Sequence, residues 1–265
     1  QIDLLKQFLE IAIAKFRTGK GSQVDVLKAQ VELSTLYQRL PVLEQQRDTA
    51  QAKVNTLLDR DPRFPLGSPQ VPRDQRFDKE LEELYQTAVT ARPELKAGEL
   101  AVQLNEGVRA LAQRQYYPDV SVAFQRFQNF HANDGFGAMV SINMPFAFWT
   151  KPKYDAAVQE ASAAVAAARA DLHTAENLTR FQIRDLLAKV RASWEVAVLY
   201  RTTVLPQAEQ GVEAARADYR TGRTSFLDLI DADRAWREFQ LAYWRVLVDR
   251  ESRVAELEQV VGTEL

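Results

Sequence analysis

Few residues of this chain have types and spacings that could carry chemistry. Its two histidines, His131 and His173, have no nearby companions at metal-ligand spacing, and we expect His131 in a loop and His173 on a helix surface. The 265-residue chain contains no cysteine, which excludes disulfides, thiolate metal sites and cysteine catalysis. The sequence has no Gly-rich phosphate loop and no nucleophile elbow. We therefore expect no enzyme activity, no cofactor and no metal centre.

Two carboxylates in the last quarter of the chain are the exception. Asp228 and Asp231 lie three residues apart in a segment with helical periodicity, so both belong to one face of a helix. Carboxylates gathered around a pore favour cations. The alternative is that Asp228 stabilises the positive end of the helix dipole. That explanation is weaker for Asp231, which lies deeper in the helix.

The segment that contains Asp228 occurs twice in the chain. Residues 16–30 align without a gap with residues 219–233, and apolar positions correspond as well. Six positions are identical, because Arg17, Thr18, Gly19, Ser22, Asp25 and Ala29 match Arg220, Thr221, Gly222, Ser225, Asp228 and Ala232. We interpret the chain as a tandem duplication.

Each copy predicts a tight reversal between two antiparallel helices. Gly19 and Gly222 suit the position just after a helix end, where a positive φ is easy for glycine. Ser22 and Ser225 are placed to cap the next helix, with an aspartate three residues later as in a capping box. On geometry alone, an ordinary helical hairpin is an equally good interpretation.

The rest of the sequence places these reversals in a mainly α-helical chain. Residues 1–59 are predicted to form a first helical hairpin with its tip at 17–22, and residues 60–92 a Pro-rich linker and a short helix. Residues 93–265 are expected to form the second repeat. That repeat is predicted to contain a helix at 93–115, a β-hairpin at 117–148, a long helix at 151–219 with a kink at Pro206, a tip at 220–224 and a helix at 225–262. Gln1 already lies in helical periodicity, so we expect an N-terminal part of the protein to precede it.

The β-hairpin is predicted from alternating polarity. Val120, Val122 and Phe124 alternate with small or polar residues, and the same pattern returns at 140–144 after a turn-rich segment. Strands of this length and alternation suit the wall of a membrane barrel. A soluble edge hairpin is the simpler interpretation of this segment alone.

Composition narrows the functional class. The formal net charge is −2 with 26% charged residues, which argues against a nucleic-acid-binding protein. The sequence also has no apolar run of about 18 residues, the length that a transmembrane helix requires.

The repeated tip, with its tyrosine or phenylalanine, glycine, serine, aspartate and alanine in fixed spacing, resembles that of the TolC-like outer-membrane efflux proteins. The order of the other parts is similar too: Arg-Pro-Glu-Leu at 92–95, Tyr-Pro-Asp-Val at 117–120, Leu-Pro-Gln-Ala at 205–208 and the ending at 257–262. Within that family, the strand exit at 145–154 and the tip at 226–229 look closest to heavy-metal efflux members.

The resemblance implies a homotrimer whose strands form a shared outer-membrane barrel, continued by a helical tunnel across the periplasm. It implies passive export, with energy from an inner-membrane pump joined through a periplasmic adaptor protein. Members of the family have two strand hairpins, whereas this chain shows only the second. A trimer of this segment would supply half of the barrel strands.

The resemblance also assigns roles at the tips. Asp228 and Asp231 match the carboxylates that narrow the periplasmic entrance, and Tyr219 matches the tip tyrosine of the closing network. Arg223 is a candidate for a closing salt bridge, since Thr224 stands where the family often has arginine. Exposed candidates for adaptor docking are Arg17, Gly19, Lys20, Arg220 and Gly222, for each of which simple surface solvation is an equal alternative.

Two other classes use long helical hairpins. A periplasmic adaptor carries one such hairpin between β-rich halves, whereas this chain predicts two hairpins and little strand. A soluble coiled-coil scaffold needs neither the strand pair nor the Pro-rich linker.

Overall fold

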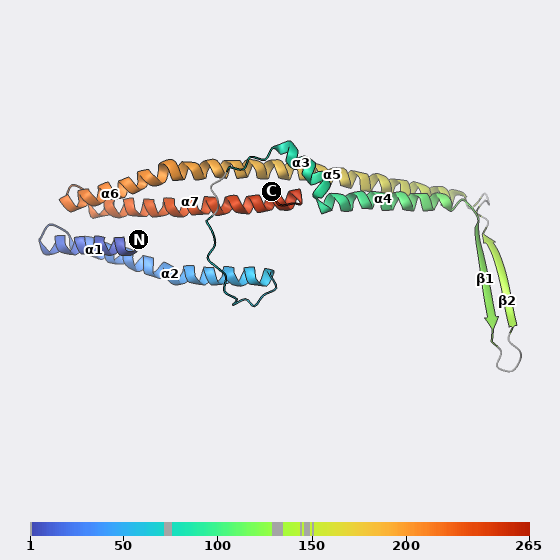
Figure 1. The fold of residues 1–265 in the computed structure, drawn as a ribbon, viewed down its shortest axis with the longest axis horizontal. Helices are drawn as coiled ribbons and strands as arrows, with labels where there is room; N and C mark the ends of the chain where they lie inside the picture. Colours follow the sequence, from blue (N-terminus) through green and yellow to red (C-terminus); the bar gives the residue numbers. More distant parts are fainter. Residues whose placement is uncertain (1, 72–75, 129–134, 144, 146–148, 150) are drawn as a thin grey trace. The chain divides into compact units, whose positions relative to one another are not determined.

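The computed structural model describes residues 2–71, 76–128, 135–143, 145, 149 and 151–265 (Figure 1). The elements in chain order are α1 (Ile2–Arg17), α2 (Gln23–Leu57), α3 (Leu81–Ala91), α4 (Pro93–Arg114), β1 (Asp119–Phe127), β2 (Gly135–Asn143), α5 (Lys151–Leu199), the π-helical turn η1 (Tyr200–Val204), α6 (Leu205–Thr221) and α7 (Phe226–Val261). They form two compact units, residues 1–76 with 191–252 and residues 77–190 with 253–265, which are described separately.

In the first unit, two helical hairpins enclose one apolar core. α1 and α2 form one hairpin, α6 and the first part of α7 form the other, and both reversals lie at the same end of this unit (Figure 1). Phe8 and Phe226 are its largest fully buried side chains. Burying an apolar side chain of this size stabilises a fold by roughly 1.5–3 kcal/mol. The other buried members of the core are Leu5, Ala12, Ala29, Val212, Tyr219, Leu229 and Ile230.

The helix predicted at 151–219 is not one regular α-helix. It comprises α5, the π-helical turn η1 and α6, and the N–H of Leu205 donates to the carbonyl of Tyr200, five residues earlier. Pro206 follows at once. Proline has no N–H and its ring crowds the carbonyl four residues before it, and the wider turn relieves both problems. The irregularity expected at Pro206 is therefore a π-helical turn that precedes the proline.

The second unit has its own core, where α3 packs against α5 and the end of α7. Leu84 and Ala88 of α3, Ile183, Leu186 and Leu187 of α5, and Leu257 and Val261 of α7 are its buried members. Gly262 ends α7 with a φ of 86°. A Cβ at Gly262 would lie 2.9 Å from the carbonyl carbon and oxygen of Ala91, so this contact requires glycine.

α4 lies alongside α5 in the same unit (Figure 1). The Arg169 guanidinium is 2.5 Å from the Glu106 carboxylate across this pair. Nearer the start of α4, Gly98 faces Leu172, whose Cδ1 would lie 2.9 Å from an added Cβ. The absence of a Cβ at Gly98 therefore permits the close approach of the two helices.

β1 and β2 form an antiparallel pair with Ser121 opposite Ser141 and Val122 opposite Val140. The hydroxyls of Ser121 and Ser141 are hydrogen-bonded at 2.7 Å on one face. On the other face, large apolar side chains are exposed, among them Val120, Val122, Phe124, Val140 and Ile142. The predicted β-hairpin is confirmed, and its turn, including His131, lies outside the described residues.

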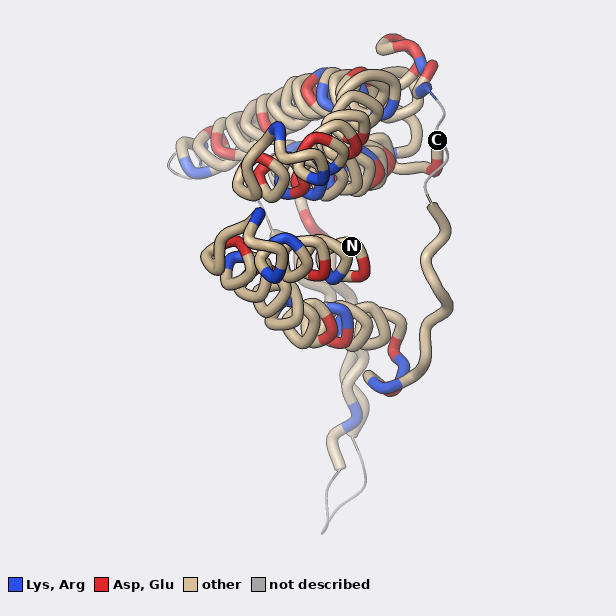
Figure 2. The backbone as a smooth tube through the Cα atoms, turned by 90° about the vertical axis from the view of Figure 1, so that its left-hand side faces the viewer, with Lys and Arg blue, Asp and Glu red and all other residues tan. Residues whose placement is uncertain are grey.

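Charged residues are distributed unevenly over the chain. They are spread along the helices, whereas the strands carry only Asp119 and Arg126 (Figure 2). A search of the described helices finds none that combines the length and the apolar character required to span a membrane.

Candidate functional site at the helical tips

The first tip joins α1 to α2 through a left-handed glycine and a capping box. Gly19 has a φ of 68°. Ser22 accepts a hydrogen bond from the Val24 N–H at 3.1 Å, and the Asp25 carboxylate accepts one from the Ser22 N–H at 3.5 Å. Arg17, Gly19 and Lys20 are exposed, as a surface available to a partner requires.

The second tip repeats this design between α6 and α7. Gly222 has a φ of 82°, and the Asp228 N–H donates to the Ser225 hydroxyl at 3.2 Å. One oxygen of the Asp228 carboxylate accepts three hydrogen bonds, from the Thr224 hydroxyl at 2.8 Å, the Ser225 hydroxyl at 2.7 Å and the Ser225 N–H at 3.0 Å. These bonds, first that of the Ser225 hydroxyl, hold the pKa of Asp228 below its usual value. Asp228 therefore caps α7, as the alternative interpretation of the sequence predicts.

Asp231 lies one turn further along α7 and, like Asp228, is exposed to solvent. Its side chain is 59% exposed and its carboxylate is 3.5 Å from the Arg234 guanidinium. Asp228 and Asp231 are thus both accessible on the outer surface of the same helix, and only Asp228 has a capping role.

Tyr219 is placed differently from the tip arginines. It is buried in the core of the first unit, stacks edge-on against Phe226 with ring centres 5.4 Å apart, and its hydroxyl has no hydrogen-bond partner among the described residues. Burial, and next the charge of Asp25, raise the pKa of Tyr219 to about 12. The hydroxyl is therefore un-ionised and available as a donor.

The remaining candidate residues of the second tip lie at the surface. Arg223 is 3.7 Å from the Asp218 carboxylate of the preceding helix, with its side chain 74% exposed. Arg220 and Gly222 are also exposed. The salt bridge of Arg223 thus closes the turn within its own hairpin.

An ion network that the sequence did not predict links α2 to α7 behind the tips. Its members are Glu32 on α2 and Asp231, Asp233, Arg234 and Arg237 on α7. The spacings of Asp233 with Arg237 and of Asp231 with Arg234, four and three residues apart, were usable signals for two pairs. Glu32 gave none, because its partners are about 200 positions away in the sequence.

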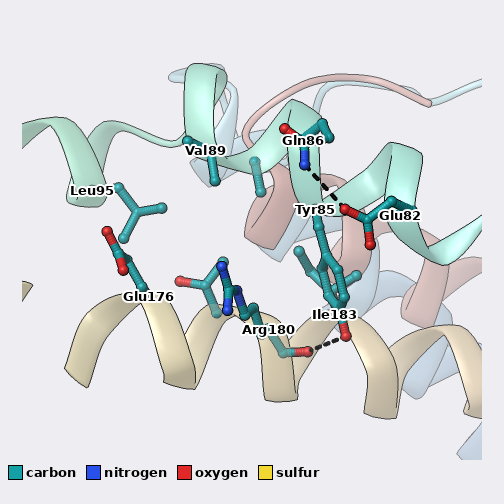
Figure 3. Close-up of a pocket in the computed structure, with 10 residues that line it drawn as sticks. Glu82, Tyr85, Gln86, Val89, Leu95, Glu176, Arg180 and Ile183 are labelled. Carbon is teal, nitrogen blue, oxygen red and sulfur yellow. Dashed lines mark hydrogen bonds between the residues drawn. The ribbon is translucent and has the colours of Figure 1, made fainter. Parts of the chain in front are cut away.

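A hollow in the second unit is a poorer candidate for a functional site. Ten residues of α3, α4 and α5 line about 240 Å³, and Figure 3 shows Tyr85 and Arg180 on opposite sides of it. The Tyr85 hydroxyl donates to the Arg180 carbonyl at 3.2 Å and Gln86 donates to Glu82 at 3.0 Å, so these polar groups already bind one another. The volume is also smaller than most ligand pockets. Nor do the described histidine and acidic side chains cluster in a group able to hold a metal ion.

Residues 84–263, more than half of the chain, match the sequence pattern of a family described as "Outer membrane efflux protein". The chain belongs to the outer membrane efflux protein family. The resemblance found in the tip sequences is thereby confirmed, and neither a periplasmic adaptor nor a coiled-coil scaffold fits a member of this family.

Individual members of the efflux family extend the comparison along the whole chain. The cobalt-zinc-cadmium resistance protein CzcC of Cupriavidus metallidurans is 24% identical over 266 residues, which cover 98% of this chain and 61% of CzcC. The solved outer-membrane channel OprN matches with a TM-score of 0.83 and 20% identity over 98% of this chain and 60% of its own. The outer membrane protein VceC of Vibrio cholerae matches with a TM-score of 0.82 and 17% identity over 99% and 64%.

These likenesses confirm the fold class, long helical hairpins with one β-hairpin in a duplicated chain. They also show that this chain spans about 60% of the length of these efflux relatives.

Proposed function

We propose that the whole protein is the outer-membrane channel of a tripartite efflux system, a passive export duct with a large periplasmic part. The observation that carries this proposal is the exposed apolar face of β1 and β2, in an efflux-family chain that also contains paired helical hairpins. Such a face is costly in water and needs a hydrophobic environment.

The strand pair fits an outer-membrane barrel. Each strand has nine residues, the length that a tilted membrane strand needs. Apolar and polar side chains alternate between the two faces, with lipid facing Val122 and the lumen facing Ser121. Because two strands cannot close a barrel, the functional state is a homotrimer in which each chain contributes strands.

The tips are the proposed periplasmic entrance. In a trimer, three copies of Asp228 and Asp231 form two acidic levels at which the duct is narrowest. Tyr219 and Arg223 are the proposed closing residues of this entrance: the Tyr219 hydroxyl is un-ionised and can donate a hydrogen bond, and Arg223 is an exposed cation at the turn. Carboxylates placed in this way favour cations over anions.

The exposed ends of both reversals are the proposed docking surface for a periplasmic adaptor protein, which connects the duct to an inner-membrane pump. Arg17, Gly19 and Lys20 contribute from the first tip, and Arg220 and Gly222 from the second. Energy for export comes from the pump, so the channel itself needs no catalytic group and no cofactor.

Metal cations are the proposed cargo. Two features support this, the likeness to the cobalt-zinc-cadmium resistance protein and the acidic tip. Carboxylates at the tips of a chain segment that has no cysteine suit ions that pass through rather than ions that are retained.

The experiment is reconstitution of the full-length protein in planar bilayers, together with complementation of a strain that lacks its channel. We expect stable cation-selective conductance, and growth on cobalt, zinc or cadmium salts restored only when the pump and adaptor are present. Full-length protein that inserts but never conducts would contradict the channel, whereas conductance without restored growth would contradict the metal cargo alone.

A further inference from the structure

The exposed gate candidate Asp231 is the outermost member of the ion network that joins α2 to α7. The Arg237 guanidinium is 2.9 Å from the Asp233 carboxylate and 3.6 Å from that of Glu32. Arg234 contacts the other oxygen of Glu32, and its second terminal nitrogen is 3.5 Å from Asp231. Arg234 is therefore shared between a carboxylate of the first hairpin and a carboxylate of the gate.

The burial of each carboxylate determines which of these ion pairs must persist. Glu32 is 7% exposed and Asp233 is 1% exposed, whereas the side chains of Asp231 and Arg234 are 59% and 53% exposed. A buried carboxylate needs a cationic partner, since an unpaired buried charge is strongly destabilising. Asp233 therefore retains Arg237, and Glu32 retains Arg234. Water can solvate the Asp231 carboxylate, so Asp231 needs a guanidinium partner least.

The ion network carries an excess of negative charge. The network holds three carboxylates and two guanidinium groups, so one negative charge per chain is left over. Because Asp231 has the longest contact with Arg234 and the most exposed carboxylate, that charge resides on Asp231. Without Glu32 the network would hold two carboxylates and two guanidinium groups, and Arg234 would neutralise Asp231.

We propose that Glu32 is a positioning residue for the acidic gate, which holds Arg234 and thereby keeps the Asp231 carboxylate available to cations. This inference rests on the proposed channel function. It gives the first helical hairpin, otherwise a docking and structural element, a direct part in the charge of the entrance.

The ion network is not a feature that both copies of the duplication share. In the two copies, Glu32 corresponds to Ala235, Asp231 to Lys28 and Arg234 to Val31. The network is thus assembled from one residue of the first copy and four of the second. Neither copy could form it with its own equivalent residues.

The test measures block of the full-length channel by hexaamminecobalt(III) in single-channel recordings, for Glu32→Gln, Asp231→Ala and the double variant. We expect Glu32→Gln and Asp231→Ala each to weaken the block by about threefold to tenfold, as for loss of a unit charge near the bound ion. In the double variant the network holds one carboxylate and two guanidinium groups, so the block should be weaker than in either single variant. Thermal unfolding of each variant is measured alongside.

Two further variants separate positioning from folding. Glu32→Asp keeps the charge and should retain normal block. Glu32→Gln with Arg234→Gln removes both partners, so Asp231 is no longer neutralised and the block should return. A purely structural role of Glu32 predicts instead that the block weakens further. Unchanged block in Glu32→Gln alongside weakened block in Asp231→Ala would overturn the role of Glu32 and leave the gate standing. Unchanged block in both would overturn the gate and this role together.

Discussion

The Lys15 ammonium of α1 lies 4.3 Å from the centre of the Tyr219 ring and donates a hydrogen bond to the Tyr219 carbonyl oxygen. The first hairpin thus holds the end of α6, where carbonyl groups lack intrahelical partners and the helix dipole is negative. Asp218 is the equivalent of Lys15 in the second copy, so the second hairpin cannot make the same contact to the first. The two copies, although similar in sequence, therefore make different contacts.

Replacing Lys15 by methionine should loosen the packing of the first hairpin on the second. The cation–π contact and the favourable charge at the helix end are both lost, which we expect to cost about 1–2 kcal/mol of unfolding free energy. Urea unfolding followed by circular dichroism measures this. The control is Lys20→Met, at an exposed position of the tip, which should change the unfolding free energy by less than about 0.5 kcal/mol. Equal effects of the two substitutions would argue against the contact.

Gly222 is expected to be required for its backbone conformation alone. Its φ of 82° is unfavourable for other residues, and a Cβ would meet nothing within 4 Å. Gly222→Ala should therefore destabilise the chain by about 1–2 kcal/mol. Gly211 also has open space around it but lies inside α6, so Gly211→Ala should stabilise by about 0.5–1 kcal/mol. Opposite signs in the two urea titrations are the expected result, and a loss of similar size at both positions would contradict the conformational explanation.

The capping role of Asp228 predicts a specific dependence on pH. The pKa of Asp228 is lower in the folded chain than its usual value of 3.8. The ionised carboxylate therefore stabilises the fold fully at pH values above 3.8, and this contribution is lost as the pH falls through the folded-state pKa. Asp228→Ala should therefore lower the thermal unfolding midpoint at about pH 7 but hardly at about pH 2. A gap that is the same at both pH values would show that the charge of Asp228 does not cap α7.

The two faces of the strand pair should respond differently to a charge. Val122 and Ser121 are neighbours on β1 that point to opposite faces. In the full-length protein, Val122→Asp should reduce the amount of trimer recovered from the outer membrane, because a charge facing lipid costs up to a few kcal/mol, whereas Ser121→Asp should be tolerated. Recovery that falls more for Ser121→Asp would mean that the lipid face has been assigned to the wrong side.

The features that sequence predicted well are those set by neighbouring residues. Gly19, Gly222 and Ser22 act within a few positions of themselves, and the positive φ values and the capping box follow from local geometry. The alternation at Val120 and Val122 likewise reports on one strand at a time. Such patterns need no knowledge of what packs against them.

What sequence could not provide is pairing between distant helices. The partners of Glu32 are about 200 residues away, and nothing near Glu32 marks it as buried. The same holds for Tyr219. The residues around it resemble those around the exposed Phe16, although only Tyr219 is buried. The π-helical turn before Pro206 was also missed, since proline signals an irregularity but not the form that it takes.

The central claim, an acidic gate at the helical tips of an outer-membrane duct, is tested most directly by the sidedness of cation block. Hexaamminecobalt(III) is added to either side of a bilayer that contains the full-length channel, with Asp228→Ala/Asp231→Ala as the variant and Glu238→Ala, an exposed acid further along α7, as the control. We predict strong block from the side of the helical tips. This block should be lost in the double variant and retained in the control. Block that is equal from both sides, or unchanged in the double variant, would contradict the account.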